Sequence, residues 1–282
     1  MAPLVPRPRS PIAPVSRRID RNIGAGVLVL LATLFTLVAC DGGEAADLAQ
    51  LEDALAGSQA VTFPNGDGQE LAGRTFGPAD APVGVVLAHG LSANQSAWYA
   101  IADRLGAEGY RVLTFDFRGY CPGGDAGCSE GSKAIETTPG DVAAALDRLR
   151  EGGQRRLAVI GSSMGGTAAL VAAAGEGDDL AAVISLSAPA VIGGLAAGPD
   201  VLERVTAAKL FLAGTGDPTA AAAAEDFFNQ SLQPKRFELL TTDDHGAQMF
   251  KGNQAEQTRT LVLGWLAAYL AEPTDRAAQD GA

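Results

Sequence analysis

Histidine, cysteine and basic side chains are scarce in this chain of 282 residues, and each scarcity excludes a kind of site. Only His89 and His245 are present, and the three cysteines form no Cys-x-x-Cys pair, so the usual zinc clusters cannot be assembled. Lysine and arginine together number 21 against 33 acidic residues, which gives a net charge of −12. Because the zinc ligands are missing, we expect no metal site. Because phosphate backbones are bound by basic surfaces, we expect no nucleic-acid partner either.

The rest of the composition is that of a globular protein. Hydrophobic residues make up 47% of the chain and charged residues 19%, with no collagen-like period, no bias toward disorder and no internal repeat. One large domain or two small ones are therefore expected.

The first forty residues have the features of an export signal. Five arginines and one acid within residues 1–21 precede an apolar run from Ile23 to Ala39, which is the order of regions in a signal peptide. The run ends in Leu37-Val38-Ala39-Cys40. This segment resembles the bacterial lipobox, whose cysteine is lipidated and becomes the new N-terminus. An uncleaved membrane helix or ordinary signal cleavage is the alternative, and the export route, Sec or Tat, stays open.

The prediction is a lipoprotein signal peptide over residues 1–39, lipidation of Cys40 and a tether over residues 40–59. The protein would then lie in the bacterial cell envelope, held by its lipid on the outer face of the cytoplasmic membrane, with a secreted or periplasmic location as the alternative. Removal of residues 1–39 takes away five arginines and one aspartate, so the net charge falls from −12 to −16. Cys121 and Cys128 remain as an even pair in an oxidising compartment, which predicts a disulfide; two free thiols are the alternative.

Short β-branched runs alternate with alanine-rich stretches in the rest of the chain, as in an α/β fold with a mostly parallel sheet. Asn65-Gly66-Asp67-Gly68 is a turn signal that makes the first two strands a hairpin. Eight strands are predicted, the last six apolar enough to be buried: Val61–Phe63, Leu71–Phe76, Val83–Ala88, Val112–Phe115, Leu157–Ile160, Val183–Leu186, Leu210–Ala213 and Phe237–Leu240. Crossover helices are expected over Ser96–Glu108, Pro139–Arg150, Met164–Ala174, Ala220–Ser231 and Glu256–Leu270.

The connection from Ser187 to Lys209 is short. It can hold one helix around Val201–Ala207, but no large cap domain. We predict one domain over residues 60–272, an eight-stranded sheet with helices on both faces, and a flexible tail over residues 273–282. Ligand sites in such sheets lie at the carboxyl ends of the strands.

Gly161-Ser162-Ser163-Met164-Gly165 stands between a predicted strand and a predicted helix. The Gly-x-Ser-x-Gly pattern in that position is typical of a sharp turn that exposes a serine hydroxyl, with glycines where neighbouring backbones come close. The bare pattern is weak evidence in a glycine-rich chain, and the strand before it and the helix after it give it weight. Ser163 is the candidate nucleophile.

A serine hydroxyl needs a base and a group that orients the base, and candidates for both follow downstream. Asp217 and His245 each come after a predicted strand, so the chain order is Ser, Asp, His. His245 would take the serine proton and later protonate the leaving group, while Asp217 would hold the tautomer of His245. Asp217 could instead be a turn residue before Pro218 or a helix N-cap. Asp243 and Asp244 compete, although such near neighbours of His245 would have difficulty reaching its Nδ1.

An acyl-transfer site also needs donors for the developing oxyanion. The backbone N–H of Met164 follows the nucleophile at a helix N-terminus, where negative charge is favoured. The second donor is expected at Leu91, in the loop after the third strand, because Gly90 lets the chain turn over the site. We expect His89 to hold this loop by hydrogen bonds rather than to perform chemistry.

Gly161 to Gly165, Asp217, His245 and His89-Gly90 together resemble the α/β-hydrolase superfamily, in particular its small cap-less serine hydrolases related to dienelactone-hydrolase-like esterases. The resemblance covers Val61 to Leu270. Asp116-Phe117-Arg118-Gly119-Tyr120 is similar to the family's Asp-x-Arg-Gly loop, whereas the Cys121–Cys128 loop replaces the family's Gly-x-Ser continuation. The resemblance implies the α/β-hydrolase fold and acyl transfer, and it leaves the substrate open.

The expected function is that of an extracytoplasmic serine hydrolase that cleaves carboxylic esters through an acyl-enzyme on Ser163, without a cofactor. The short Ser187–Lys209 connection implies an open site, which suits small or solvent-exposed acyl groups. A serine peptidase or amidase of the same fold, or a non-catalytic envelope lipoprotein, is the alternative. A cysteine hydrolase is excluded because neither Cys121 nor Cys128 follows a strand-to-helix turn. The sequence does not indicate an oligomeric state.

Overall fold

A computed structural model describes residue 52 and residues 54–121 and 127–271, all within the unit Asp41–Ala282. The predicted signal peptide, Cys40 and the predicted tail over residues 273–282 lie outside the described residues. Among the helices that are described, none has the length and apolar character needed to cross a membrane.

Eight strands form one sheet in the order β1-β2-β4-β3-β5-β6-β9-β10. β2 is antiparallel to both β1 and β4, and the other neighbours are parallel. The predicted eight-stranded, mostly parallel sheet is therefore confirmed. Its strands are β1 (Gln59–Pro64), β2 (Glu70–Phe76), β3 (Val83–Ala88), β4 (Arg111–Phe115), β5 (Arg156–Ser162), β6 (Leu180–Leu186), β9 (Ala208–Gly214) and β10 (Lys235–Leu240).

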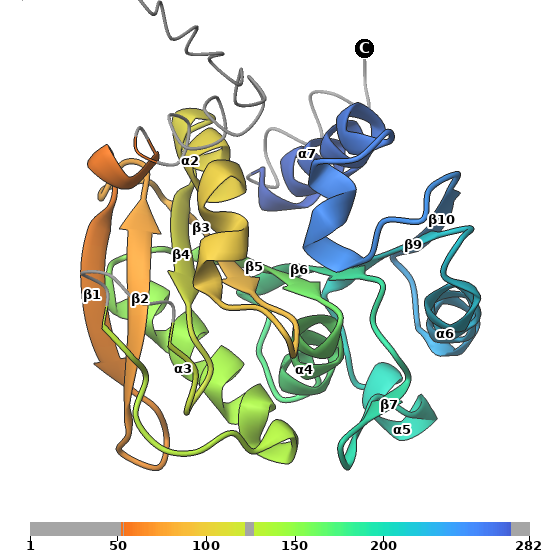
Figure 1. Cartoon of the computed structure of the whole chain (residues 1–282), viewed down its shortest axis with the longest axis horizontal. Coiled ribbons are helices and arrows are strands. Elements are labelled where there is room, and N and C mark those ends of the chain that lie inside the picture. Colours follow the sequence, from red (N-terminus) through yellow and green to blue (C-terminus); the bar gives the residue numbers. More distant parts are fainter. Residues whose placement is uncertain (1–51, 53, 122–126, 272–282) are drawn as a thin grey trace, which may run out of the picture. The chain divides into compact units, whose positions relative to one another are not determined.

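Helices cover both faces of this sheet, and each face has its own apolar core (Figure 1). One core contains α3 (Thr138–Glu151), α4 (Met164–Ala173) and α6 (Pro218–Gln230). The other contains α2 (Tyr99–Ala107) and α7 (Ala255–Leu270). Because both faces are covered, the inner strands are apolar almost throughout their length. The described residues also form the short 3-10 helices η1 (Gln95–Trp98), η3 (Ile135–Thr137) and η4 (Gly246–Phe250).

Two strand and boundary predictions need correction. The prediction that Phe237–Leu240 is a buried central strand is wrong, because β10 is at the edge of the sheet, pairs with β9 alone, and leaves Leu239 46% exposed. The predicted tether over residues 40–59 extends too far, since β1 begins at Gln59 and Ala54 is buried in the core beside α2 and α7.

The Ser187–Lys209 connection holds a small hairpin and one short helix instead of the predicted helix around Val201–Ala207. The hairpin pairs β7 (Val191–Ile192) with β8 (Leu195–Ala196), and α5 spans Pro199–Leu202. The helix starts early because Pro199 follows Gly198 and suits the first helical turn. After the helix, the Val205 carbonyl oxygen accepts a hydrogen bond from the ammonium group of Lys209, which is wholly buried, at 2.8 Å.

The loop after β4 is fixed by a buried ionic network. Asp141 of α3 is fully buried and accepts hydrogen bonds from the Arg118 guanidinium at 2.7 and 3.1 Å and from the Arg118 backbone N–H at 3.0 Å. Asn65, in the turn between β1 and β2, donates to the same carboxylate at 2.9 Å. The Asp-x-Arg-Gly loop is thus tied to α3 and to the first hairpin.

The disulfide predicted between Cys121 and Cys128 is present, with Cα atoms 4.2 Å apart. Ser129, the next residue, donates from its hydroxyl to the Asp116 carbonyl oxygen at 2.6 Å and accepts from the Ala72 N–H at 2.9 Å. The carboxyl side of the disulfide loop is therefore anchored to β2 and to the end of β4.

The buried network makes a prediction about stability. Asp141→Ala should lower the free energy of unfolding by about 3–5 kcal/mol, because it removes the buried partner of the Arg118 charge and leaves only Asp67, whose side chain is 64% exposed. Asp147→Ala is the matched control, since Asp147 pairs with Arg150 but its side chain is 66% exposed, and it should cost less than about 1 kcal/mol. Urea unfolding measures both, and equal losses for the two variants would contradict the account.

Candidate active site

Ser163 stands at a sharp turn between β5 and α4, with φ 52° and ψ −120°. Its N–H donates to the Leu186 carbonyl oxygen at 2.8 Å, which ties the turn to β6. A side chain at Gly161 would overlap the Gly165 backbone, and a side chain at Gly165 would overlap the Ala88 and His89 carbonyl groups. The two glycines therefore allow α4 to start directly against β5 and the end of β3, as the sequence pattern predicts.

Asp217 and His245 come together at the same end of the sheet. The Asp217 Oδ2 atom lies 2.5 Å from His245 Nδ1, and the His245 side chain is 45% exposed. Because a carboxylate accepts hydrogen bonds, this contact fits the tautomer with its proton on Nδ1, in which Nε2 is an acceptor. The other Asp217 oxygen accepts the Ala220 N–H at 3.1 Å and caps α6. Asp217 is thus both the N-cap considered as an alternative and the partner of His245.

The two competing acids take other positions. Asp244 accepts the Thr242 hydroxyl proton at 2.7 Å, within its own turn. Asp243 lies against Gly216, where a side chain would overlap the Asp243 carboxylate. Among the described carboxylates, Asp217 is the one recorded against the His245 ring.

His89 holds the loop after β3, as expected. Its Nδ1–H donates to the Gly90 carbonyl oxygen at 2.8 Å, and its Nε2 accepts the Phe117 N–H at 3.2 Å. Burial lowers the pKa of His89 to about 4, so the ring is neutral near pH 7. Its Nε2 lies 3.6 Å from an Asp116 oxygen, but a neutral ring in this tautomer makes no ion pair there.

Asp116 supports the other side of the same loop. Its two oxygens accept the Gln95 backbone N–H at 2.9 Å and the Gln95 side-chain amide at 2.7 Å. Thr114 donates to the Gln95 side-chain oxygen at 3.0 Å. Burial raises the pKa of Asp116 to about 6 despite these donors. No local sequence pattern indicates the contribution of Gln95.

The two predicted oxyanion donors lie beside the turn. Met164 is the first residue of α4, and the first N–H groups of a helix have no acceptor within the helix. Leu91 lies in the loop after β3, which His89 holds. In the described part of the chain, no acceptor is recorded for the N–H of Leu91 or of Met164.

A cavity of about 380 Å³ joins these parts. Ser163 and His245 both line it, together with the loop after β3, η1, β7 and η4; its walls are Gly90, Leu91, Ser92, Ala93, Ala97, Ser162, Ile192, Ala247 and Gln248. Most of these side chains are small or apolar, as in small-molecule sites. The described ends of the disulfide loop do not contribute to these walls.

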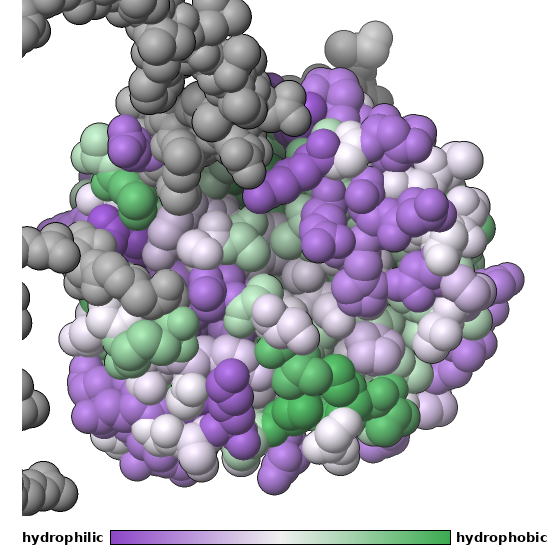
Figure 2. Space-filling model, in the orientation of Figure 1, coloured by the Kyte–Doolittle hydropathy of each residue, from purple (hydrophilic) through white to green (hydrophobic). Residues whose placement is uncertain are grey.

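An apolar patch lies on the surface near β7 and α4 (Figure 2). Val191 of β7 is 66% exposed, and Leu91 on the cavity wall is 40% exposed. Ile192, the neighbour of Val191, lines the cavity. The short hairpin therefore carries apolar side chains to the edge of the cavity without forming a cap over it.

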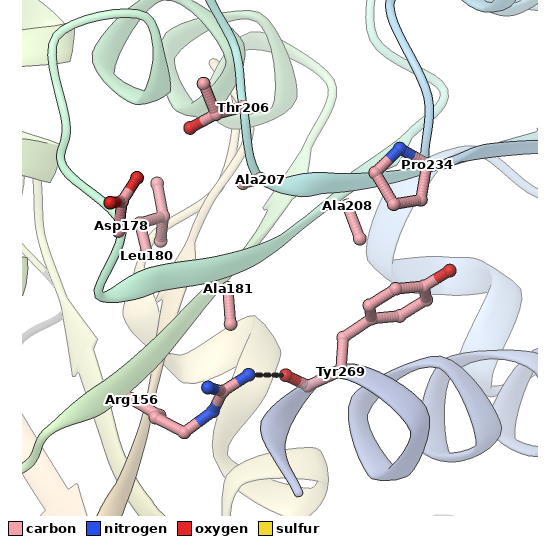
Figure 3. Close-up of a pocket in the computed structure, with 9 residues that line it drawn as sticks. All are labelled: Arg156, Asp178, Leu180, Ala181, Thr206, Ala207, Ala208, Pro234 and Tyr269. Atoms are coloured by element: carbon pink, nitrogen blue, oxygen red, sulfur yellow. Dashed lines mark hydrogen bonds between the residues drawn. The ribbon is translucent and has the colours of Figure 1, made fainter. Parts of the chain in front are cut away.

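A second hollow, of about 200 Å³, lies at the opposite ends of the strands (Figure 3). Leu180, Ala181 and Ala208 line it at the starts of β6 and β9, and the Arg156 guanidinium donates to the Tyr269 carbonyl oxygen at 2.5 Å. Ser163, Asp217 and His245 follow the carboxyl ends of their strands, where ligand sites of such sheets form. The cavity at Ser163 is therefore the candidate active site.

Besides Gln95, two other contributions to the site escaped the sequence analysis. Ser162 accepts the Ala247 N–H at 2.9 Å, a contact between residues 85 positions apart that no local pattern indicates. The hairpin that brings Ile192 to the cavity did have a signal, because Gly193-Gly194 between two apolar pairs is a two-residue hairpin turn.

Solved structures of low sequence identity share this fold. An esterase of Pyrococcus furiosus matches with a TM-score of 0.64 and 18% identity, over 78% of this chain and 95% of that chain. A dienelactone hydrolase of Anabaena variabilis matches with a TM-score of 0.62 and 23% identity, over 75% and 97%. An enol-lactonase of Burkholderia xenovorans matches with a TM-score of 0.59 and 19% identity, over 74% and 100%.

The sequence itself matches a family description. The profile of the alpha/beta hydrolase family covers residues 85–280, which includes the turn at Ser163 and the partners Asp217 and His245. This match extends over more than half of the chain. The protein belongs to the alpha/beta hydrolase family.

Proposed function

We propose that the protein is a serine hydrolase that cleaves carboxylic esters through an acyl-enzyme on Ser163. The observation that carries the proposal is the contact between Asp217 and His245 at 2.5 Å, beside a cavity that His245 shares with Ser163. Family membership and the esterases among the structures of the same fold support it.

In the proposed reaction, the Ser163 hydroxyl oxygen attacks the carbonyl carbon of the ester, and its proton passes to His245 Nε2. Asp217 stabilises the imidazolium that forms. The tetrahedral oxyanion accepts hydrogen bonds from the N–H groups of Leu91 and Met164. Collapse of this intermediate breaks the bond to the leaving oxygen, which takes the proton from His245. Water then attacks the acyl carbonyl carbon and gives its proton to His245. The bond to the Ser163 oxygen breaks, that oxygen takes the proton back from His245, and the carboxylic acid leaves.

The proposed substrates are esters with a small or solvent-exposed acyl group. The cavity of about 380 Å³ is near the lower end of the range of about 300–1,000 Å³ for small-molecule sites. Leu91 and Ile192 give it apolar walls, and the short β7–β8 hairpin leaves it open. Long acyl chains would project past these walls into solvent.

The proposed location is the bacterial cell envelope, where a lipid on Cys40 would hold the protein on the outer face of the cytoplasmic membrane. The support is the sequence before Cys40, together with a disulfide between Cys121 and Cys128, which is the kind of bond that oxidising compartments maintain.

The proposed chemistry predicts that Ser163→Ala abolishes ester hydrolysis. Residues 41–282 should hydrolyse p-nitrophenyl acetate and butyrate faster than octanoate, with a burst of p-nitrophenol as the acyl-enzyme accumulates. In Ser163→Ala the burst should vanish, because no hydroxyl remains to be acylated. Wild-type protein no faster than Ser163→Ala on every ester would overturn the proposal in favour of a peptidase of narrow specificity or a binding protein.

The two contacts of Asp217 can be separated by Asp217→Asn. Asparagine is as good an N-cap as aspartate, so the free energy of unfolding should change by less than about 0.5 kcal/mol. The amide disturbs the His245 tautomer, so kcat should fall at least about 100-fold. Asp243→Asn is the matched control and should keep wild-type kcat; equal losses in the two variants would show that Asp217 has no special role.

Lipid attachment predicts that Cys40→Ala moves the full-length protein from the membrane fraction to the soluble fraction of a bacterial cell. Cys121→Ser is the control, since that cysteine lies in the folded domain and its loss leaves the anchor intact. If Cys40→Ala stays in the membrane fraction after an alkaline wash, an uncleaved apolar segment is the anchor and lipidation of Cys40 is refuted.

A further inference from the structure

The hydroxyl of Ser162 links the two loops that would have to cooperate in catalysis. Ser162 ends β5 immediately before Ser163, is 6% exposed, and accepts the Ala247 N–H at 2.9 Å. Ala247 is the second residue after His245. One hydrogen bond therefore connects the end of β5, directly before Ser163, with the backbone that follows His245.

The packing around this hydrogen bond is close. Gly246, between His245 and Ala247, has φ 59°, and a side chain there would overlap the Ser162 hydroxyl. On the other side, a side chain at Gly90 would stand 3.8 Å from the same oxygen and 3.3 Å from Ser163 Cβ. The segment His245–Phe250 is called the base loop below. The Ser162 hydroxyl thus lies where the base loop and the loop of Leu91 both approach the turn.

The far end of the base loop is fixed separately. The Ser187 hydroxyl donates to the Met249 sulfur at 3.7 Å, and the Phe250 ring packs edge-on against Trp98 with centroids 6.0 Å apart. The His245 side chain itself is 45% exposed, so packing constrains it little. Its position then depends on Asp217, which orients the ring, and on the hydrogen bond to Ser162, which sets where the backbone stands.

We propose that Ser162 is a positioning residue that holds His245 at the correct distance from Ser163, an inference that rests on the proposed ester hydrolysis. The hydroxyl of Ser162 takes no part in bond making. It acts through the backbone of Ala247, and because it adjoins Ser163 in the chain, the nucleophile and the base share one anchor.

The test is Ser162→Ala in a chain of residues 41–282, with kcat and KM measured on p-nitrophenyl butyrate. The variant leaves the Ala247 N–H without its acceptor, and kcat should fall about tenfold, the rate equivalent of one hydrogen bond lost, with KM unchanged. Ser185→Ala is the matched control, because Ser185 is equally buried on β6 and has no recorded bond to the base loop; it should keep wild-type kcat. Thermal unfolding confirms that both variants are folded.

The outcomes separate this inference from the function on which it rests. Active wild type, inactive Ser163→Ala and a loss of kcat confined to Ser162→Ala support the positioning role. Active wild type with Ser162→Ala at wild-type kcat overturns the role and leaves the esterase proposal intact. An equal loss in Ser185→Ala also overturns it, since any buried hydroxyl would then serve. Wild type without activity on esters overturns both.

Discussion

The arrangement of the site depends on the backbone turn at Ser163. A positive φ at a residue with a side chain costs about 1–2 kcal/mol, so the surrounding structure must hold it. The hydrogen bond from the Ser163 N–H to Leu186 and the close approach of α4 to β5, which Gly161 and Gly165 permit, provide that support. The turn raises the serine at the carboxyl end of β5 and leaves the Met164 N–H without a helical acceptor.

The partners of this turn are held by groups that each make more than one contact. Asp217 caps α6 with one oxygen and contacts His245 with the other, so the start of a helix fixes Asp217 relative to His245. His89 joins the loop of Leu91 to the end of β4 as a buried neutral ring, whose pKa of about 4 keeps it uncharged near pH 7. Burial of His89 leaves His245, which lines the cavity, as the candidate base of the proposed reaction.

The sequence analysis predicted what local patterns encode. The eight strands, the turn at Ser163 and the supporting role of His89 follow from apolar runs and from a glycine pattern between strand and helix. Which carboxylate meets His245 was a choice among Asp217, Asp243 and Asp244, and three-dimensional reach decides it. The bond between Ser162 and Ala247 spans 85 positions and has no local signature. The edge position of β10 was missed because an apolar run does not reveal how many neighbours a strand has.

The central claim is that the second of two adjacent serines is the nucleophile. The most direct measurement is to treat the folded domain with a fluorophosphonate, which phosphonylates activated serines, and to locate the label by peptide mass spectrometry. The account predicts one label per chain, on Ser163 and not on Ser162, because Ser163 occupies the turn at the cavity while the Ser162 hydroxyl accepts the Ala247 N–H. A label on Ser162, or a chain that takes up no label, would contradict it.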